Sequence, residues 1–146
     1  MHTALKAAIL SLTLATPLSA QAEDFNIAFL AASSQNGFNQ AIYDGIKQAA
    51  SGYDNVSTQI FDGEFSATAQ FSQVEDIVAG GKFDAIIITP NDTVGIATAL
   101  EDAVKAGVKV GTTLFPVGPE LTEMEPQVPG LTVTVASDPV VGATAQ

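Results

Sequence analysis

The sequence has 146 residues, and its 5 Lys and Arg residues against 16 Asp and Glu residues give a net charge of −11 at pH 7. Nucleic-acid binding is excluded, because binding to phosphates needs clustered Lys and Arg and the chain has no arginine. Cysteine is absent and His2 is the only histidine, which excludes disulfides, zinc–thiolate sites and histidine-based triads. An apolar fraction of 47% predicts a folded chain of about one domain.

The first 22 residues have the three parts of a secretory signal peptide. Met1–Lys6 carries a positive charge, Ala7–Ala15 is apolar but too short to span a bilayer, and Ala20–Ala22 has the small-x-small pattern of a cleavage site. The alternative is an amphipathic first helix, for which the segment lacks a polar face. We therefore expect cleavage near Glu23 and export to the periplasm.

Strands and helices are predicted to alternate after the leader. Short apolar runs rich in β-branched or aromatic residues predict strands over Phe25–Ala31, Val56–Phe61, Phe83–Thr89 and Val108–Thr113. Apolar residues at helical spacing predict helices over Phe38–Ala50, Ala67–Ala79 and Val94–Ala106. This alternation is typical of a parallel sheet joined by right-handed crossovers. The predicted fold class is α/β with a doubly wound parallel sheet.

Local signals place several of the helix ends. The glycine pair at 80–81 ends the second predicted helix, and Gly107 ends the third. Asp92 or Thr93 is expected to cap the start of the third helix. In the first helix the apolar or small positions are 38, 41, 42, 45, 46 and 49, and we expect this stripe to face the sheet.

The last part of the chain has a different composition. Phe115–Gly130 holds four prolines and three glutamates, which predicts an exposed loop. Leu131–Ala136 alternates like a fifth strand, and Asp138-Pro139 is a strong helix start only eight residues before the last residue. We interpret the sequence as a fragment of a longer protein. The predicted domains are a signal peptide (1–22), an N-terminal α/β ligand-binding lobe (23–130), and a crossover strand with the start of an incomplete second lobe (131–146).

Candidate ligand-binding residues follow the carboxyl ends of the predicted strands, where open α/β sheets bind their ligands. Amides, hydroxyls and carboxylates occur there beside aromatic residues. This combination suits a neutral polyhydroxylated ligand, because hydroxyls need both donors and acceptors. The alternative is that Asn, Asp and Ser occupy these loops only as turn and cap residues. The residues are Ser33, Ser34, Gln35, Asn36, Phe38, Asp62, Glu64, Phe65, Asn91, Asp92 and Phe115.

Signals of an enzyme are weak. The carboxylate pairs at 75–76 and 101–102 lie side by side in predicted helices, so that their side chains diverge. Neither a GxGxxG dinucleotide motif nor a GxxxxGK[ST] phosphate loop occurs. A calcium loop needs an alternating ligand spacing, which is missing from the acidic cluster Glu120, Glu123 and Glu125. We expect a protein without catalytic activity, metal or cofactor.

Three stretches resemble the periplasmic binding proteins that are similar to ribose-binding protein. The first is IAFLAASSQNGFNQAIYDGIKQAA (Ile27–Ala50), where a strand leads into a polar loop with Asn, then an aromatic residue, then a helix with Asp-Gly. The second is FSQVEDIVAGGKFDAIIITPNDTVGIATALEDAVKAGVKV (Phe71–Val110). The third is VASDPVVGA (Val135–Ala143), which resembles the point at which such chains first cross to a second lobe.

The resemblance implies the solute receptor of an ABC importer. Such a receptor binds a sugar or polyol between two lobes and delivers it to permease subunits, and a chemoreceptor is a further expected partner. The resemblance places first-loop contacts at Gln35, Phe38 and Asn39. Ribose binders have a second aromatic residue where Asn39 stands, and Asp-Arg where this chain has Leu114-Phe115, so ribose is disfavoured as the ligand. The alternative function is the ligand-binding sensor domain of a membrane signalling receptor.

Overall fold

The chain folds around one parallel sheet. The computed structural model describes residues 23–137 and 143–144, and the sheet has the strand order β2-β1-β3-β4-β5, with every neighbouring pair parallel. This arrangement confirms the predicted α/β doubly wound fold. The strands are β1 (Phe25–Ala31), β2 (Val56–Asp62), β3 (Ala85–Ile88), β4 (Lys109–Leu114) and β5 (Val133–Ala136).

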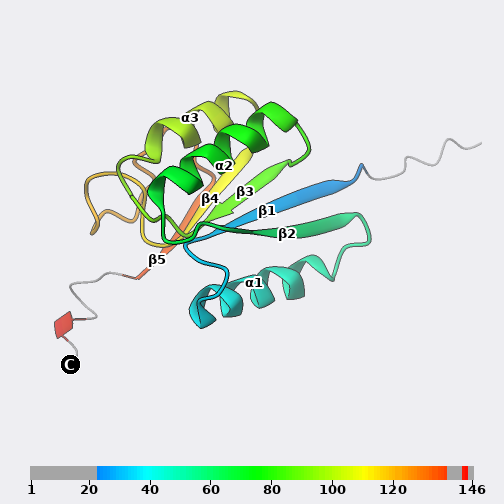
Figure 1. Cartoon of the computed structure of the whole chain (residues 1–146), viewed down its shortest axis with the longest axis horizontal. Coiled ribbons are helices and arrows are strands. Elements are labelled where there is room, and N and C mark those ends of the chain that lie inside the picture. Colours follow the sequence, from blue (N-terminus) through cyan, green and yellow to red (C-terminus); the bar gives the residue numbers. More distant parts are fainter. Residues whose placement is uncertain (1–22, 138–142, 145–146) are drawn as a thin grey trace, which may run out of the picture.

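Helices cover both faces of this sheet. Helices α2 (Ala67–Gly80) and α3 (Ala97–Lys105) pack on one face, and α1 (Gly37–Ala50) packs on the opposite face beside β1 and β2 (Figure 1). Because every crossover runs from the end of one strand to the start of the next parallel strand, all the strands point the same way. Their carboxyl ends therefore meet at one edge of the sheet, on the left in Figure 1.

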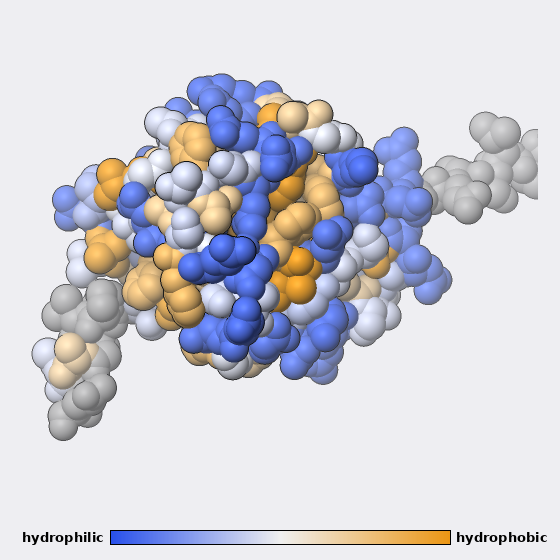
Figure 2. Space-filling view, in the orientation of Figure 1, coloured by the Kyte–Doolittle hydropathy of each residue, from blue (hydrophilic) through white to orange (hydrophobic). Residues whose placement is uncertain are grey.

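The main core lies between the sheet and the α2–α3 layer. Leu30, Ile86 and Ile88 from the strands pack there with Val74 and Leu100 from the helices, and all five are fully buried. Burial of each such side chain contributes about 1.5–3 kcal/mol. In the space-filling view, hydrophobic residues also gather at the centre, between α2 and α1 (Figure 2).

The first helix is rotated relative to the predicted stripe. Its buried positions are Asn39 and Ala50, and the Tyr43 ring stacks on Phe29 of β1 with 6.0 Å between ring centroids. Phe38, which the predicted stripe includes, is 54% exposed. The stripe was misplaced because a polar residue, Asn39, occupies a position that faces the sheet.

The helix ends follow local hydrogen bonds. Gly81 ends α2 with φ of 58°, as the glycine pair predicts, and Gly107 follows α3 with φ of 93°. Helix α3 begins at Ala97, three residues later than predicted, and its N-cap is Ile96 without a side-chain hydrogen bond. The prediction that Asp92 or Thr93 caps this helix is therefore wrong. The reason is Asp92, whose Oδ1 accepts hydrogen bonds from the backbone N–H groups of Val94 and Gly95, both at 2.9 Å. These bonds hold the preceding residues in a separate turn.

Residues 115–130 form no helix or strand, as predicted. The Gln127 side chain closes this loop, since its Oε1 accepts from the Glu120 N–H at 3.0 Å and its Nε2 donates to the Glu120 carbonyl at 2.7 Å. Its three glutamates are exposed, and no group of residues suited to hold a metal ion occurs in residues 23–137 and 143–144.

Two predictions fall outside the described residues, namely the signal peptide over 1–22 and the helix start at Asp138-Pro139. Within the part of the chain that the structure describes, no helix is long and apolar enough to cross a membrane.

Candidate functional site

A groove runs along the carboxyl ends of the strands. Its central pocket, of ≈ 360 Å³, adjoins two open pockets of ≈ 460 and ≈ 510 Å³. The first flanking pocket shares Asn36 and Phe65 with the centre, and the second shares Asn91 and Phe115. We call these three connected pockets the strand-end groove. Every candidate residue from the sequence except Ser34 lines it. They are Ser33, Gln35, Asn36, Phe38, Asn39, Asp62, Glu64, Phe65, Asn91, Asp92 and Phe115.

Three phenylalanine rings line the central pocket. Phe38 lies in the first turn of α1, Phe65 lies between β2 and α2, and Phe115 follows β4, so the rings come from three separate parts of the chain. They are 54%, 66% and 37% exposed, respectively. Exposed aromatic rings around a pocket that also holds amides provide flat apolar surfaces on which a ligand ring can pack.

The backbone beside two of these rings is strained. Glu64, Phe65 and Leu114 have positive φ angles of 52°, 51° and 71°, a region that costs a non-glycine residue about 1–3 kcal/mol. They are all the non-glycine residues with positive φ in the described part of the chain, and each borders the groove. Such concentrated strain indicates a functional site. The sequence gives no sign of it, since nothing in a Leu or Phe residue predicts this conformation.

Asn39 is buried at the wall of the central pocket without a partner for its oxygen. It is 3% exposed, and its Oδ1 has no hydrogen bond among the described residues. A buried acceptor without a donor costs about 1–3 kcal/mol. Such an acceptor is expected where a ligand or an ordered water supplies the donor. Asn39 is therefore a candidate ligand contact.

Gln70 of α2 is the opposite case. Its side chain is fully buried, and its Nε2 donates to the carbonyls of Ala31 at 3.2 Å and Thr89 at 2.8 Å. Its Oε1 accepts from the Asn91 N–H at 2.7 Å. Gln70 thus ties the ends of β1 and β3 together beneath the groove. The position of Gln70, four residues before Val74 on the apolar face of the predicted helix, is a sequence signal from which this role can be predicted.

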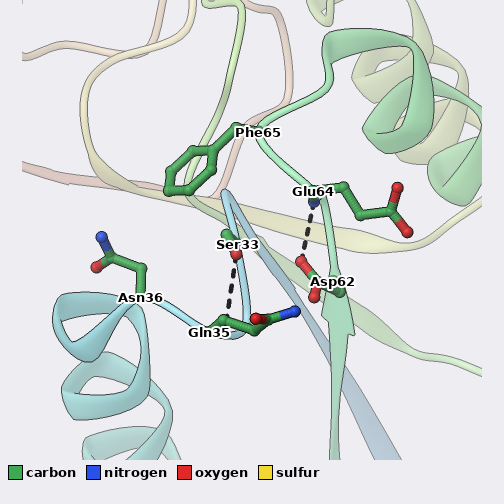
Figure 3. Close-up of a pocket in the computed structure, with 6 residues that line it drawn as sticks. All are labelled: Ser33, Gln35, Asn36, Asp62, Glu64 and Phe65. Carbon is green, nitrogen blue, oxygen red and sulfur yellow. Dashed lines mark hydrogen bonds between the residues drawn. The ribbon is translucent and has the colours of Figure 1, made fainter.

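Asp62 closes the end of β2 against the loop after β1. Its Oδ1 accepts from the backbone N–H groups of Ser34 at 3.0 Å and Glu64 at 2.9 Å, and its Oδ2 accepts from the Ser34 hydroxyl at 2.7 Å. These hydrogen bonds, led by the one from the Ser34 hydroxyl, lower the pKa of Asp62 to about 2. In Figure 3 the Phe65 ring lies over the opening beside Asn36, whereas the Glu64 side chain points away.

Two predicted site residues also act as caps, as the alternative interpretation expected. Asn36 Oδ1 accepts from the N–H groups of Phe38 at 2.9 Å and Asn39 at 3.3 Å and so caps α1. Asp92 caps the turn before α3, and its pKa is lowered by hydrogen bonds from the Gly95 and Val94 N–H groups.

The two remaining polar candidates are less constrained. Asn91 donates from Nδ2 to the Ala32 carbonyl at 3.1 Å, which leaves its Oδ1 as an acceptor at the groove. Gln35 is exposed at the rim, and its backbone N–H donates to the Ser33 hydroxyl at 3.3 Å. Amide groups with free donors or acceptors suit the hydroxyls of a neutral ligand.

Comparison with known proteins identifies relatives of this fold. The family described as "Periplasmic binding protein domain" matches residues 27–133, well over half of the chain. No protein among curated sequences matches significantly. A solute-binding protein of an ABC transporter from Actinobacillus succinogenes, solved with bound D-allose, is similar at 28% identity with a TM-score of 0.57. The match covers 66% of this chain and 34% of that one.

Two further solved structures share the fold. The Caulobacter myo-inositol binding protein matches with a TM-score of 0.68 at 21% identity, over 88% of this chain and 40% of its own. The fructose-binding periplasmic domain of a hybrid two-component system matches with a TM-score of 0.67 at 19% identity, over 83% and 37%. The chain thus spans between a third and two fifths of the length of these relatives.

Proposed function

This chain belongs to the periplasmic binding protein family, and from that premise we propose that it captures a sugar or polyol in the periplasm and delivers it to an ABC permease. The leader over 1–22 would export it, residues 23–130 would form the N-terminal ligand-binding lobe, and residues 131–146 would begin the crossing to a second lobe. The similarity at 28% identity to a protein solved with D-allose supports a carbohydrate ligand.

The single observation that carries this proposal is the unpaired acceptor of Asn39. Asn39 lines the central pocket, and in the proposed mechanism its amide turns so that Oδ1, which is otherwise buried, accepts from a sugar hydroxyl there. The faces of the Phe38 and Phe115 rings can pack against the C–H face of the same sugar ring. No step of this mechanism breaks a covalent bond, so the proposed role is binding and not catalysis.

Transport requires that binding be coupled to a change of shape. The strand-end groove is open to solvent on one side, and in the proposed mechanism a second lobe closes over the sugar there by a hinge motion. Closure places the ligand between two sets of contacts and presents the closed form to the permease. A chemoreceptor that recognises the closed form is a further proposed partner.

The test is titration calorimetry of the protein in its full-length natural form. The ligands are neutral sugars and cyclitols, including D-allose and myo-inositol. Replacing Asn39 with Leu (Asn39→Leu) should abolish binding of the best ligand while leaving the melting temperature equal or higher, because an unpaired buried acceptor is removed. Gln48→Leu, an exposed amide on the same helix, should bind like the wild type. Wild-type affinity in Asn39→Leu would falsify the proposed site.

A sensor domain of a membrane signalling receptor is the second candidate. The observation that favours it is the similarity to the fructose-binding periplasmic domain of a hybrid two-component system. The two candidates differ in what the ligand causes. Deletion of the gene should abolish uptake of the labelled sugar if the protein serves an importer, and should leave uptake intact while removing the transcriptional response if it is a sensor.

A further inference from the structure

The lysines of the described residues all lie away from the strand-end groove. Lys47 and Lys105 are in the last turns of α1 and α3, Lys82 follows α2, and Lys109 begins β4. All of these positions are at the amino ends of the strands. The seven residues of β1 span about 20 Å, which exceeds the Debye length of about 8 Å at physiological ionic strength. No lysine there can neutralise an anion bound in the groove.

The groove itself carries acidic side chains. Asp62, Glu64 and Asp92 line it, and the exposed glutamates of residues 115–130 lie in the loop at the same edge of the sheet (Figure 1). Three helix N-termini also point to this edge, and each contributes about +0.5 elementary charge. The three carboxylates outweigh that contribution. The edge therefore has a negative potential that disfavours anions.

The aromatic residues provide a second and independent feature. The rings of Phe38, Phe65 and Phe115 border one pocket of ≈ 360 Å³, and a cation over an aromatic face is attracted by the ring quadrupole. Asn91 Oδ1 is an acceptor at the same pocket, and Asn39 adds a second one when its amide turns toward the ligand as proposed above. Aromatic faces, acceptors and surrounding carboxylates together suit an ammonium group.

We propose that the strand-end groove prefers a sugar or polyol that carries a protonated amine over its neutral parent, and that it rejects sugar acids and sugar phosphates. This inference rests on the carbohydrate-binding function proposed above, and it specifies the charge of the preferred ligand. Cation–π attraction and the negative edge should make the amine bind about three- to tenfold more tightly than the parent. The acid should bind at least about tenfold more weakly than the parent.

The experiment compares each neutral sugar with its own amino and acid derivatives, for example D-glucose, D-glucosamine and D-glucuronate, and likewise for the galactose and mannose series. Titration calorimetry uses the protein in its full-length natural form. The pH lies below the pKa of the sugar amine, so that the amine is protonated, and the titration is repeated at two salt concentrations. In the series that binds, the amine should bind most tightly, and its advantage should shrink at high salt because the attraction is screened.

Two charge-matched variants locate the effect. Glu64→Gln removes a carboxylate at the outer rim of the groove (Figure 3), which acts through the electrostatic potential and not by contact, and should reduce the amine-to-parent affinity ratio about two- to threefold. Asp54→Asn removes an exposed carboxylate at the opposite end of β2 and should leave the ratio unchanged. If a parent sugar binds at least as tightly as its amine, this inference is overturned and the proposed function stands. If no member of any series binds, both are overturned.

Discussion

For Phe38, a contribution to the hydrophobic core and a contribution to ligand binding can be distinguished by experiment. It is 54% exposed at the central pocket, whereas Phe71 packs against the core. We expect Phe38→Ala to weaken sugar binding more than about tenfold, or about 1.4 kcal/mol, and to change the free energy of unfolding by less than about 0.5 kcal/mol. Phe71→Ala should instead cost up to about 3 kcal/mol of stability. Calorimetry and urea denaturation separate these effects.

A matched control for Phe38 is Tyr53, an aromatic residue that is 66% exposed at the other end of α1. Tyr53→Ala should keep wild-type affinity. If Phe38→Ala bound sugar normally but melted at a much lower temperature, Phe38 would be a structural residue and the ligand ring would have to pack elsewhere.

Asp62 should make stability depend on pH in acid. Its hydrogen bonds from Ser34 and Glu64 favour the carboxylate and lower its pKa from 3.8 to about 2. A lowered pKa in the folded state adds stability above pH 3.8, and this contribution is lost as the pH falls to about 2. Asp62→Asn keeps the shape but cannot ionise. Thermal unfolding should therefore show a steeper loss of stability in this range for the wild type than for the variant.

Equal slopes for the wild type and Asp62→Asn would contradict the assigned hydrogen bonds.

At the scale of elements, the Gln70 side chain of α2 connects the ends of strands β1 and β3. Its amide bonds to carbonyls of β1 and β3 and to the N–H of Asn91. Gln70→Leu should cost at least about 3 kcal/mol in the free energy of unfolding, because several buried backbone groups lose their partner. Gln73→Leu loses one bond to the Asp62 carbonyl but also removes an Oε1 that is buried without a partner, so it should cost at most about 1 kcal/mol. A cost for Gln70→Leu no larger than that for Gln73→Leu would refute this role.

The same elements explain how far sequence reasoning reaches. Strand β1 was predicted with its observed bounds, and β3 (Ala85–Ile88) lies within the predicted strand Phe83–Thr89, because these signals are local and strong. The start of α3 was missed because one carboxylate, Asp92, fixes a turn there. The positive φ of Leu114 was missed because it depends on what surrounds the chain in the fold. Tertiary constraints of this kind leave no periodic pattern.

The candidate site was predictable for a topological reason. Parallel strands bring their carboxyl ends to one edge, so loops distant in sequence had to meet, and Gln35, Asn91 and Phe115 do line one groove. The sequence could not distinguish a residue that contacts the ligand from a residue that caps a helix. Asn36 and Asn39 are both amides near the start of α1, yet one caps the helix and the other keeps an unpaired oxygen. That difference is set by the orientation of the helix on the sheet.

At the scale of the whole molecule, residues 23–146 supply one side of the proposed binding cleft, and we expect that this side alone does not bind the ligand tightly. The relatives are about twice as long as this chain, and in the proposed mechanism a second lobe supplies about half of the ligand contacts. If the complete receptor bound at about 1 μM, or about −8 kcal/mol, half of those contacts would leave the affinity of residues 23–146 in the millimolar range or weaker.

The same segment should also be poorly stable, since Val133 and Val135 of β5 are 48% and 62% exposed. Circular dichroism of residues 23–146 would establish that the segment is folded before titration against sugars, cyclitols and amino sugars. Because a folded single lobe retains Asn39 and the three phenylalanine rings, weak binding should still disappear in Asn39→Leu. Micromolar binding to any probe would show that one lobe is enough, and the hinge-closure mechanism would then have to be abandoned.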